Sequence, residues 1–318
     1  MRLVFMGTPE FSATILEDLI PQHEVCAVYT RPDAVRGRGM SPSPSPVKRV
    51  AQAYQIEVRT PQGLKDPAVW QELAAFEPDA VCVAAYGAIL PREVLDIPRL
   101  ACLNVHASLL PAWRGAAPIE RAILAGDKET GVCVMRMEEA LDTGDYCVCR
   151  TTGIEDKPAE ALSDELANLG SHALLTALVH LERGALDWTR QDEEKASYAP
   201  RIRKGELDVN PSDSATQAAL KVQASSAAHP SRCILAGRAL TLLALATPHT
   251  EDGQELAQGL APGEACFIAK RLFMGMADGP VEVLALKPDG KVRMEAKAFA
   301  AGVQGLKAGT VPWKACHA

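Results

Sequence analysis

The first half of the chain alternates short apolar runs with segments of helical character, and this alternation constrains the fold more than any other feature. Residues 79–85 form a continuous apolar run, which predicts a strand buried on both faces. Strands that alternate with helices predict a twisted parallel sheet with helices on both of its faces. The other strands are expected at 3–6, 25–29, 100–105 and 131–137, and the helices at 47–55, 67–76, 117–125 and 160–183.

The segment after the first strand, Gly7-Thr8-Pro9-Glu10, predicts the start of a helix. Thr8 is the expected N-cap, with Pro9 at the first helical position. A dinucleotide-binding protein would carry G-x-G-x-x-G here, and the sequence has neither that pattern nor a Walker loop. This argues against a nucleotide cofactor.

The second half of the chain has a different pattern. From about Asp208 the chain becomes rich in Ser, Ala and Asp, and then turns to short apolar runs separated by glycines. Ala236-Gly237 and Asp289-Gly290 are typical of hairpin turns. The pattern predicts a small antiparallel β domain, for which a barrel is one solution. We expect a catalytic domain over 1–187, a linker over 188–210 and the β domain over 211–318, with strands at 233–235, 239–245, 265–268, 281–286 and 292–294.

The composition, 47% hydrophobic and 23% charged over 318 residues, is typical of a globular protein. No apolar run reaches the roughly 18 residues of a membrane span, and the N-terminus does not have the pattern of a signal peptide. We therefore expect a cytoplasmic protein without a membrane partner. The nine cysteines are scattered, which favours buried free thiols over disulfides or zinc. No histidine pair has metal-ligand spacing, so no metal is expected.

The formal net charge of −7 lies entirely in residues 1–204, because residues 205–318 hold 11 basic and 11 acidic residues. A polyanion could bind only at local basic patches. One such patch includes Arg31, Arg36, Arg38, Lys48 and Arg49, with only Asp33 opposing it, and a second includes Arg201, Arg203 and Lys204. On charge alone, both are solvated loops.

Polar residues with catalytic potential follow the buried strand at 100–105. In an extended segment Asn104 and His106 point to the same side. The amide can donate a hydrogen bond to an oxyanion, and the imidazole can accept a proton near neutral pH. Asp142, in a turn after a later strand, could stabilise a protonated histidine. Taken singly, His106 could equally be a core histidine and Asp142 a turn residue.

Taken together, these residues carry a resemblance to a known family. The chain resembles the formyltransferases that use 10-formyltetrahydrofolate, nearly without a break over residues 1–150 and more thinly at 198–200. One departure is Ala140, which replaces a glycine usual in the family. The matching segments are 6–11, 45–48, 86–91, 104–111, 113–118 and 141–145.

The resemblance implies a Rossmann-like catalytic domain followed by a small C-terminal β-barrel that assists tRNA binding. It implies transfer of the formyl group of 10-formyltetrahydrofolate to the α-amino group of initiator methionyl-tRNA, for translation initiation, by a monomer that needs no metal. It implies a catalytic trio in which His106 is the base, Asn104 the oxyanion donor and Asp142 the stabilising carboxylate. The folate pocket would include Ser108, Leu109, Leu110 and Pro111 with Ile89 and Leu90, and the tRNA would contact Arg38, Arg36 and Lys48.

Three alternatives share parts of this pattern. A formyltransferase that acts on an amino sugar or a ribonucleotide amine would have the same trio, but would not need the basic loop or the β domain. A formyltetrahydrofolate hydrolase would use water as the acceptor. A binding module would hold folate or RNA without turnover, and would not need an intact trio.

Overall fold

The structure is a computed structural model that describes residues 1–35, 42–246 and 257–317. The chain divides into two compact units, which are described separately below. The first comprises Met1–Pro118, Lys128–Gly153 and Leu162–Pro200, and the second comprises Ile119–Asp127, Ile154–Ala161 and Arg201–Ala318.

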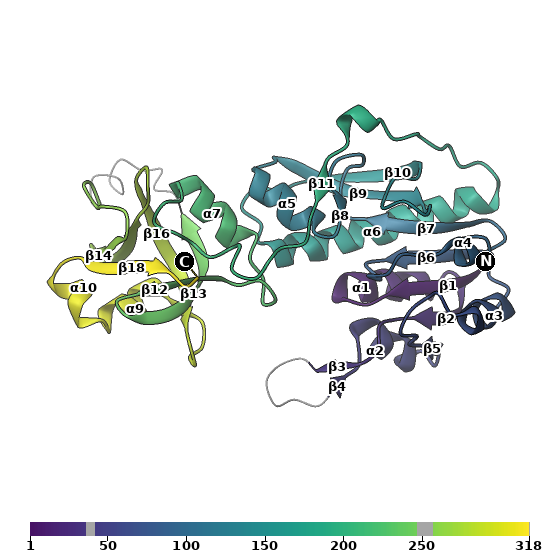
Figure 1. The fold of residues 1–318 in the computed structure, drawn as a ribbon, viewed down its shortest axis with the longest axis horizontal. Helices are drawn as coiled ribbons and strands as arrows, with labels where there is room; N and C mark the ends of the chain where they lie inside the picture. The colour runs from purple at the N-terminus through teal and green to yellow at the C-terminus, as the bar shows by residue number, and fades with distance from the viewer. Residues whose placement is uncertain (36–41, 247–256, 318) are drawn as a thin grey trace. The chain divides into compact units, whose positions relative to one another are not determined.

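The first unit is built on a twisted sheet with strand order β10-β9-β7-β6-β1-β2-β5 (Figure 1). The neighbouring strands β5, β2, β1, β6 and β7 are all parallel. β9 pairs with β7 in antiparallel fashion, and β10 pairs with β9 in the same way. The chain moves outward from β1 to β2 and β5 and then returns to β6 on the other side of β1. The strands are β1 (Arg2–Gly7), β2 (Glu24–Tyr29), β5 (Glu57–Arg59), β6 (Ala80–Ala84), β7 (Ala101–His106), β9 (Glu129–Arg136) and β10 (Tyr146–Gly153).

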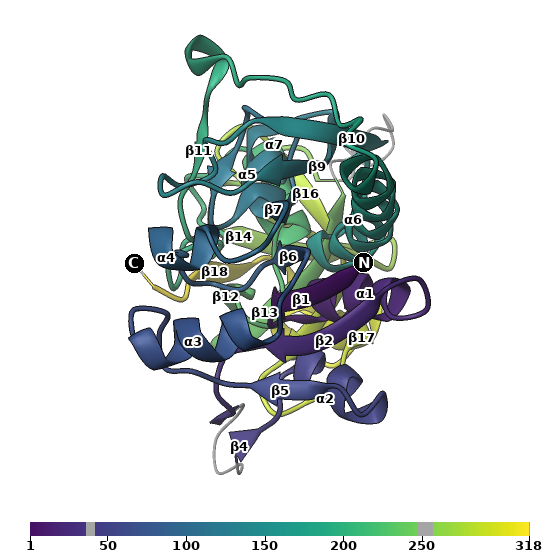
Figure 2. The same cartoon turned by 90° about the vertical axis from the view of Figure 1, so that its right-hand side faces the viewer.

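Helices cover both faces of this sheet. Figure 2 shows α1 and α6 on one side and α3 and α4 on the other. Gly170 of α6 lies so close to β7 that an added Cβ would be 2.7 Å from a methyl group of Val105. On the opposite face, Leu73 and Val94 pack with side chains of β1 and β6. The helices are α1 (Glu10–Leu19), α2 (Pro46–Ala53), α3 (Pro67–Ala75), α4 (Arg92–Leu95) and α6 (Ala159–Glu182).

The carboxyl ends of β1, β2 and β6 meet where the strand order reverses. The Thr8 hydroxyl lies 3.5 Å from the Tyr86 carbonyl oxygen and accepts a hydrogen bond from the Arg31 backbone at 3.4 Å. The prediction that Thr8 is the helix N-cap is therefore wrong, because the hydroxyl contacts neighbouring strand ends and Pro9 occupies the cap position. Ligands of such sheets bind at this edge.

The second unit contains a closed antiparallel barrel. Its strand order is β13-β12-β18-β14-β15-β16-β17, and pairing of β13 with β16 closes six of these strands. Ala236 and Gly237 have φ values of 49° and 74°, which fits the predicted turn between β12 and β13. The strands are β12 (Ser231–Leu235), β13 (Arg238–Ala246), β14 (Glu264–Ile268), β15 (Arg271–Gly275), β16 (Pro280–Pro288), β17 (Met294–Glu295) and β18 (Val311–Ala315).

Within the described residues of the second unit, three helices accompany the barrel, and α5 precedes them in the chain. A capping box of Ser214 and Gln217 starts α7, and Val222 packs into the barrel core with Trp313. The fold prediction, a mostly parallel α/β unit followed by a β-barrel, is confirmed. The helices are α5 (Pro118–Ala125), α7 (Ala215–Gln223), α9 (Ala296–Ala301) and α10 (Gln304–Ala308).

The segment expected to be a linker has structure of its own. It contains a 3-10 turn, η1 (Glu193–Lys195), and β11 (Tyr198–Ala199), which pairs in parallel with β8 (Arg114–Gly115). The part of this segment that ends at Pro200 thus belongs to the first compact unit. The domain boundaries themselves stay a prediction. Among the helices that the structure describes, none is long and apolar enough to cross a membrane.

Candidate active site

The site is centred on the end of β7, where Asn104 and His106 project from the same face of the sheet. Every residue of this strand is buried, and Asn104 and His106 are 8% and 5% exposed. Val105, which points to the other face, packs against α6. Helix α6 therefore holds the strand on the face opposite Asn104 and His106, and these two buried side chains have little freedom to move.

The two ring nitrogens of His106 have different neighbours. Nε2 lies 2.9 Å from the carbonyl oxygen of Trp113, and Nδ1 lies 3.6 Å from Oδ2 of Asp142. Because a carbonyl only accepts hydrogen bonds, Nε2 must carry the proton in this contact. In the neutral ring, Nδ1 is then the nitrogen that can take a proton, and it faces the carboxylate.

Asp142 lies in a turn with left-handed backbone geometry, with a φ of 54°. Aspartate tolerates this conformation better than most residues. Its Oδ2 also accepts a hydrogen bond of 2.9 Å from the backbone N–H of Gly115. The turn places the carboxylate between Gly115 and the histidine.

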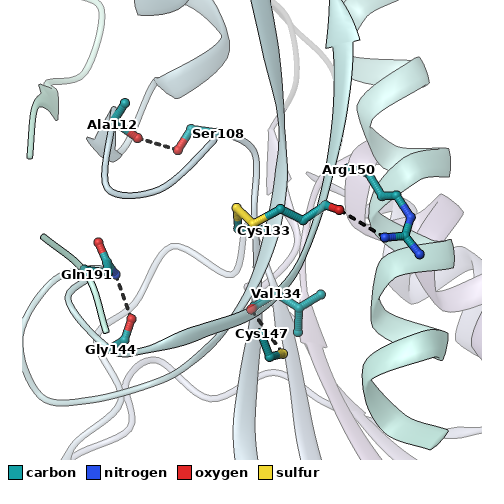
Figure 3. Close-up of a disulfide and its surroundings, with 9 residues drawn as sticks. Ser108, Ala112, Cys133, Val134, Gly144, Cys147, Arg150 and Gln191 are labelled. Atoms are coloured by element: carbon teal, nitrogen blue, oxygen red, sulfur yellow. Dashed lines mark hydrogen bonds between the residues drawn. A yellow bond between two sulfur atoms is a disulfide. The ribbon is translucent and has the colours of Figure 1, made fainter. Parts of the chain in front are cut away.

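A buried polar network lies behind this turn, and sequence reasoning did not find it. The side-chain amide of Gln191 donates to the carbonyl oxygens of Asp142 (2.9 Å) and Gly144 (2.7 Å), and Figure 3 shows the second of these bonds. Its carbonyl accepts from Nε of Arg114 at 2.9 Å. Arg114 is fully buried and forms two hydrogen bonds with Glu193. That carboxylate raises the pKa of Arg114, and the guanidinium lowers the pKa of Glu193.

The strand pair β8–β11 joins this network to the loop after β7. Ser197 accepts at its hydroxyl from the Trp113 backbone (2.9 Å) and at its carbonyl from the Arg114 backbone (2.8 Å). Gly115 has a φ of 126°, and an added Cβ would be 2.8 Å from the Ala199 carbonyl oxygen. Only glycine fits this close approach. The sequence signal for the network was present in the motifs at 113–118 and 198–200, although neither motif shows that the two segments pair.

Comparison with known proteins identifies the family. The sequence pattern described as "Formyl transferase" matches residues 1–178, and "Formyl transferase, C-terminal domain" matches residues 201–304. The chain belongs to the formyl transferase family. A methionyl-tRNA formyltransferase from Methylococcus capsulatus is 42% identical over 98% of this chain and 100% of its own length. The prediction of a formyl-transferring enzyme is confirmed.

Solved structures of formyl transferases and related proteins share the fold. HypX from Aquifex aeolicus, solved with tetrahydrofolic acid, has a TM-score of 0.63 at 19% identity and covers 96% of this chain and 48% of its own. An N-formyltransferase from Helicobacter canadensis, solved with folinic acid and dTDP-3-aminofucose, has a TM-score of 0.62 at 15% identity and covers 90% and 98%. At these identities the likeness supports the fold alone.

The residues predicted for the formyl transferase's folate pocket differ in exposure. Ile89 is 71% exposed, whereas Leu90 and Leu110 belong to buried apolar clusters. The Ser108 hydroxyl donates to the Ala112 carbonyl at 2.6 Å inside its own loop (Figure 3). The side chains of Ser108, Leu90 and Leu110 therefore make contacts inside the protein, and their place in a folate pocket stays a prediction. Leu109 and Pro111 are partly buried in the same loop, which includes a cis bond between Leu110 and Pro111.

The predicted tRNA-contacting residues are only partly within the described chain. Arg36 and Arg38 lie outside the described residues. Lys48 binds both carboxylate oxygens of Asp33, at 2.9 and 2.8 Å. Asp33 is not the only acidic residue facing this patch, because Glu10 pairs with Arg49 at 2.7 Å. Two of the five basic residues in the patch thus have acidic partners.

The expectation of free thiols is wrong at one pair of cysteines. Cys133 of β9 and Cys149 of β10 lie directly opposite each other and form a disulfide (Figure 3). A bulge at Cys147 shifts the register, so Cys149 rather than Val148 comes to lie opposite Cys133. Cys133 also pairs in register with His106, which places the disulfide beside the strand that carries His106. The spacing of cysteines along the chain could not show this pairing between strands.

The part of the chain that the structure describes holds no cluster of three or more His, Cys, Asp or Glu side chains suited to a metal ion. The expectation about metals stays a prediction.

Proposed function

We propose that this enzyme transfers the formyl group of 10-formyltetrahydrofolate to the α-amino group of methionine esterified to initiator tRNA, as a cytoplasmic monomer in translation initiation. The observation that carries the proposal is similarity to a methionyl-tRNA formyltransferase over 98% of this chain, through both compact units. Coverage of both units does not by itself separate this acceptor from an amino sugar, because the N-formyltransferase solved with dTDP-3-aminofucose also covers 90% of this chain, so the 42% identity to the tRNA enzyme supports the choice.

His106 is the proton acceptor in the proposed mechanism. The neutral amine of methionine attacks the formyl carbon, and the nitrogen then loses a proton to Nδ1 of His106. The Trp113 carbonyl holds the proton on Nε2, so Nδ1 is free to accept. The imidazolium that forms lies 3.6 Å from the Asp142 carboxylate, which stabilises its positive charge.

Asn104 is the proposed donor to the oxyanion of the tetrahedral intermediate. It lies two residues before His106 on the same face of β7 and is held in a buried strand. One such preorganised donor contributes about 3 kcal/mol to transition-state stability. The imidazolium then gives its proton to N10 of the folate, the bond between the formyl carbon and N10 breaks, and tetrahydrofolate leaves while the formyl carbon remains on the methionine nitrogen.

The proposed folate site lies against the loops 86–91 and 108–111, where Ile89 and Leu109 offer apolar surface and the backbone offers polar groups. The proposed tRNA site includes Arg36, Arg38 and Lys48. For Lys48 the contact requires exchange of its Asp33 partner for a phosphate.

The test is a direct assay of the acceptor. The protein is mixed with 10-formyltetrahydrofolate and methionyl initiator tRNA, and the product is analysed for formyl-methionyl-tRNA. We expect formylation that depends on the charged tRNA. Release of formate at the same rate without tRNA would indicate a hydrolase, and formylation of amino sugars alone would indicate a different acceptor.

A further inference from the structure

Gln191 is a buried glutamine whose side chain uses three of its hydrogen-bonding positions. It is 5% exposed and lies between Thr189, which pairs with the start of β10, and β11, which pairs with β8. Trp188 stacks against Arg136 at 4.4 Å, and the Thr189 backbone donates to the Tyr146 carbonyl at 2.8 Å. These contacts, together with those of Ser197, hold the segment on both sides of Gln191.

The orientation of the Gln191 amide is fixed by its partners. Nε of Arg114 can only donate, so the amide oxygen must face it, and the two amide N–H groups must face the carbonyls of Asp142 and Gly144. Arg114 has no freedom to move away, because it is fully buried and its other nitrogens bind Glu193. The two donors of Gln191 therefore bind both ends of the Asp142–Gly144 turn.

We propose that Gln191 is a positioning residue for Asp142, and that Arg114 orients Gln191 for this role. The inference rests on the proposed role of Asp142 in catalysis. Asp142 is held in left-handed geometry, and the position of its carboxylate depends on where the turn lies. The two hydrogen bonds from Gln191 act on the backbone of the turn, whereas the Gly115 N–H and His106 contact only the carboxylate of Asp142. A displacement of about 1 Å at a catalytic group can cost on the order of 100-fold in rate.

The first test compares Gln191→Ala with a matched control, Gln223→Ala. Gln223 is also a glutamine whose Nε2 binds two backbone carbonyls, those of Glu155 (2.8 Å) and Lys157 (3.0 Å), but it lies in the second compact unit. We expect Gln191→Ala to lower kcat by between about 10-fold and 100-fold while KM for folate and for tRNA stays within about twofold. The Gln223→Ala variant should keep the wild-type kcat.

The second test asks whether Gln191 acts through Asp142. In the Asp142→Asn background, Gln191→Ala should cause no further loss of kcat, because its effect is already contained in the loss of the carboxylate. Additive losses would overturn the proposal, as would a Gln191→Ala kcat within twofold of wild type, or a rise in KM alone. If Asp142→Asn itself kept the wild-type kcat, the proposed role of Asp142 would fail instead.

A second variant keeps the proposal testable if Gln191→Ala does not fold. Gln191→Glu has nearly the same volume and still accepts from Arg114, but its carboxylate has no N–H to donate to the two turn carbonyls. We expect the same loss of kcat with unchanged KM. A folded Gln191→Glu enzyme with wild-type kcat would overturn the proposal.

Discussion

At the scale of single residues, the contacts of His106 determine what its ring can do. The Trp113 carbonyl fixes which nitrogen carries the proton, and the Asp142 carboxylate faces the other nitrogen. A histidine that only filled the core would not need a carboxylate at that position. This arrangement leaves Nδ1 as the nitrogen that can accept a proton.

Replacing His106 by Ala should abolish formyl transfer, because it removes the proposed proton acceptor. Folate affinity should be nearly unchanged and the protein should still fold, since the polar contacts of the ring are one backbone carbonyl and the Asp142 carboxylate. The measurements are a formylation assay, folate binding by fluorescence and the Tm. A variant that lost its fold together with its activity would support a core histidine instead.

The placement of Asn104 and His106 on one face could be predicted from the sequence, whereas the residues that hold the Asp142 turn could not. Asn104 and His106 are two positions apart, so strand geometry alone places them on one face. Gln191 lies 49 positions from Asp142, and its role depends on a pairing between β8 and β11 that no local pattern shows. Polar residues in a segment with linker-like composition give no sign that they are buried.

At the scale of elements, the β8–β11 pair joins the loop after β7 to the segment at 188–199. Gly115 is its critical position, because its N–H holds Asp142 and its α-carbon lies against the Ala199 carbonyl. A side chain here would separate the two strands and withdraw the donor from the carboxylate.

We therefore expect Gly115→Ala to lower both the free energy of unfolding, by about 1–3 kcal/mol, and kcat. Gly237→Ala is the matched control, because Gly237 also has a positive φ (74°) but has no atom near its added Cβ. The control should lose stability and keep its kcat. Urea unfolding and formylation assays measure the two effects, and equal kcat in both variants would contradict this role for Gly115.

The disulfide between β9 and β10 gives a prediction about thiol number. The chain has nine cysteines, of which seven are free in the structure. Alkylation of the unfolded protein should modify seven thiols before reduction and nine after it. Nine reactive thiols in unreduced, unfolded protein would show that the pair is not bonded.

Cys147 gives a separate prediction about the folded protein. Burial raises the pKa of Cys147 to about 11. In the folded protein this thiol should therefore react slowly at neutral pH.

The elements that the sequence predicted are those with strong patterns of their own. The buried strand β6 and the helices α3 and α6 lie within about two residues of their expected bounds. β10, β15 and β18 were not predicted. β10 is a partly exposed edge strand with polar residues at 150–152, and β18 contains a proline, so both depend on pairing with a neighbour rather than on their own propensity.

At the scale of the whole molecule, the substrate and the protein both carry negative charge. A protein of net charge −7 can bind a polyanion only where its basic residues are gathered. The segment from Arg31 to Arg49 contains such a group and follows the carboxyl end of β2, which is the edge where Thr8 and Tyr86 meet. Two of its basic residues, Lys48 and Arg49, already have acidic partners. Of the patch residues that the structure describes, Lys48 and Arg49 would have to exchange these partners for phosphates before they could contact tRNA.

Arg38→Ala should raise KM for tRNA and leave folate affinity unchanged, because it removes a phosphate contact and no apolar surface of the folate site. The affinity of the wild-type enzyme for tRNA should fall steeply as salt rises, since each phosphate contact releases counterions. In the variant, the slope of log affinity against log salt concentration should be smaller by about the contribution of one phosphate contact. Steady-state kinetics between low and moderate salt measure both effects. Arg183→Ala, which removes an exposed positive charge directly after α6, where Glu182 lies near Met1 at the amino end of β1, serves as the comparison for a general charge effect. If Arg38→Ala matched Arg183→Ala at every salt concentration, the segment would be a solvated loop, and an acceptor smaller than tRNA would become the better explanation of the site.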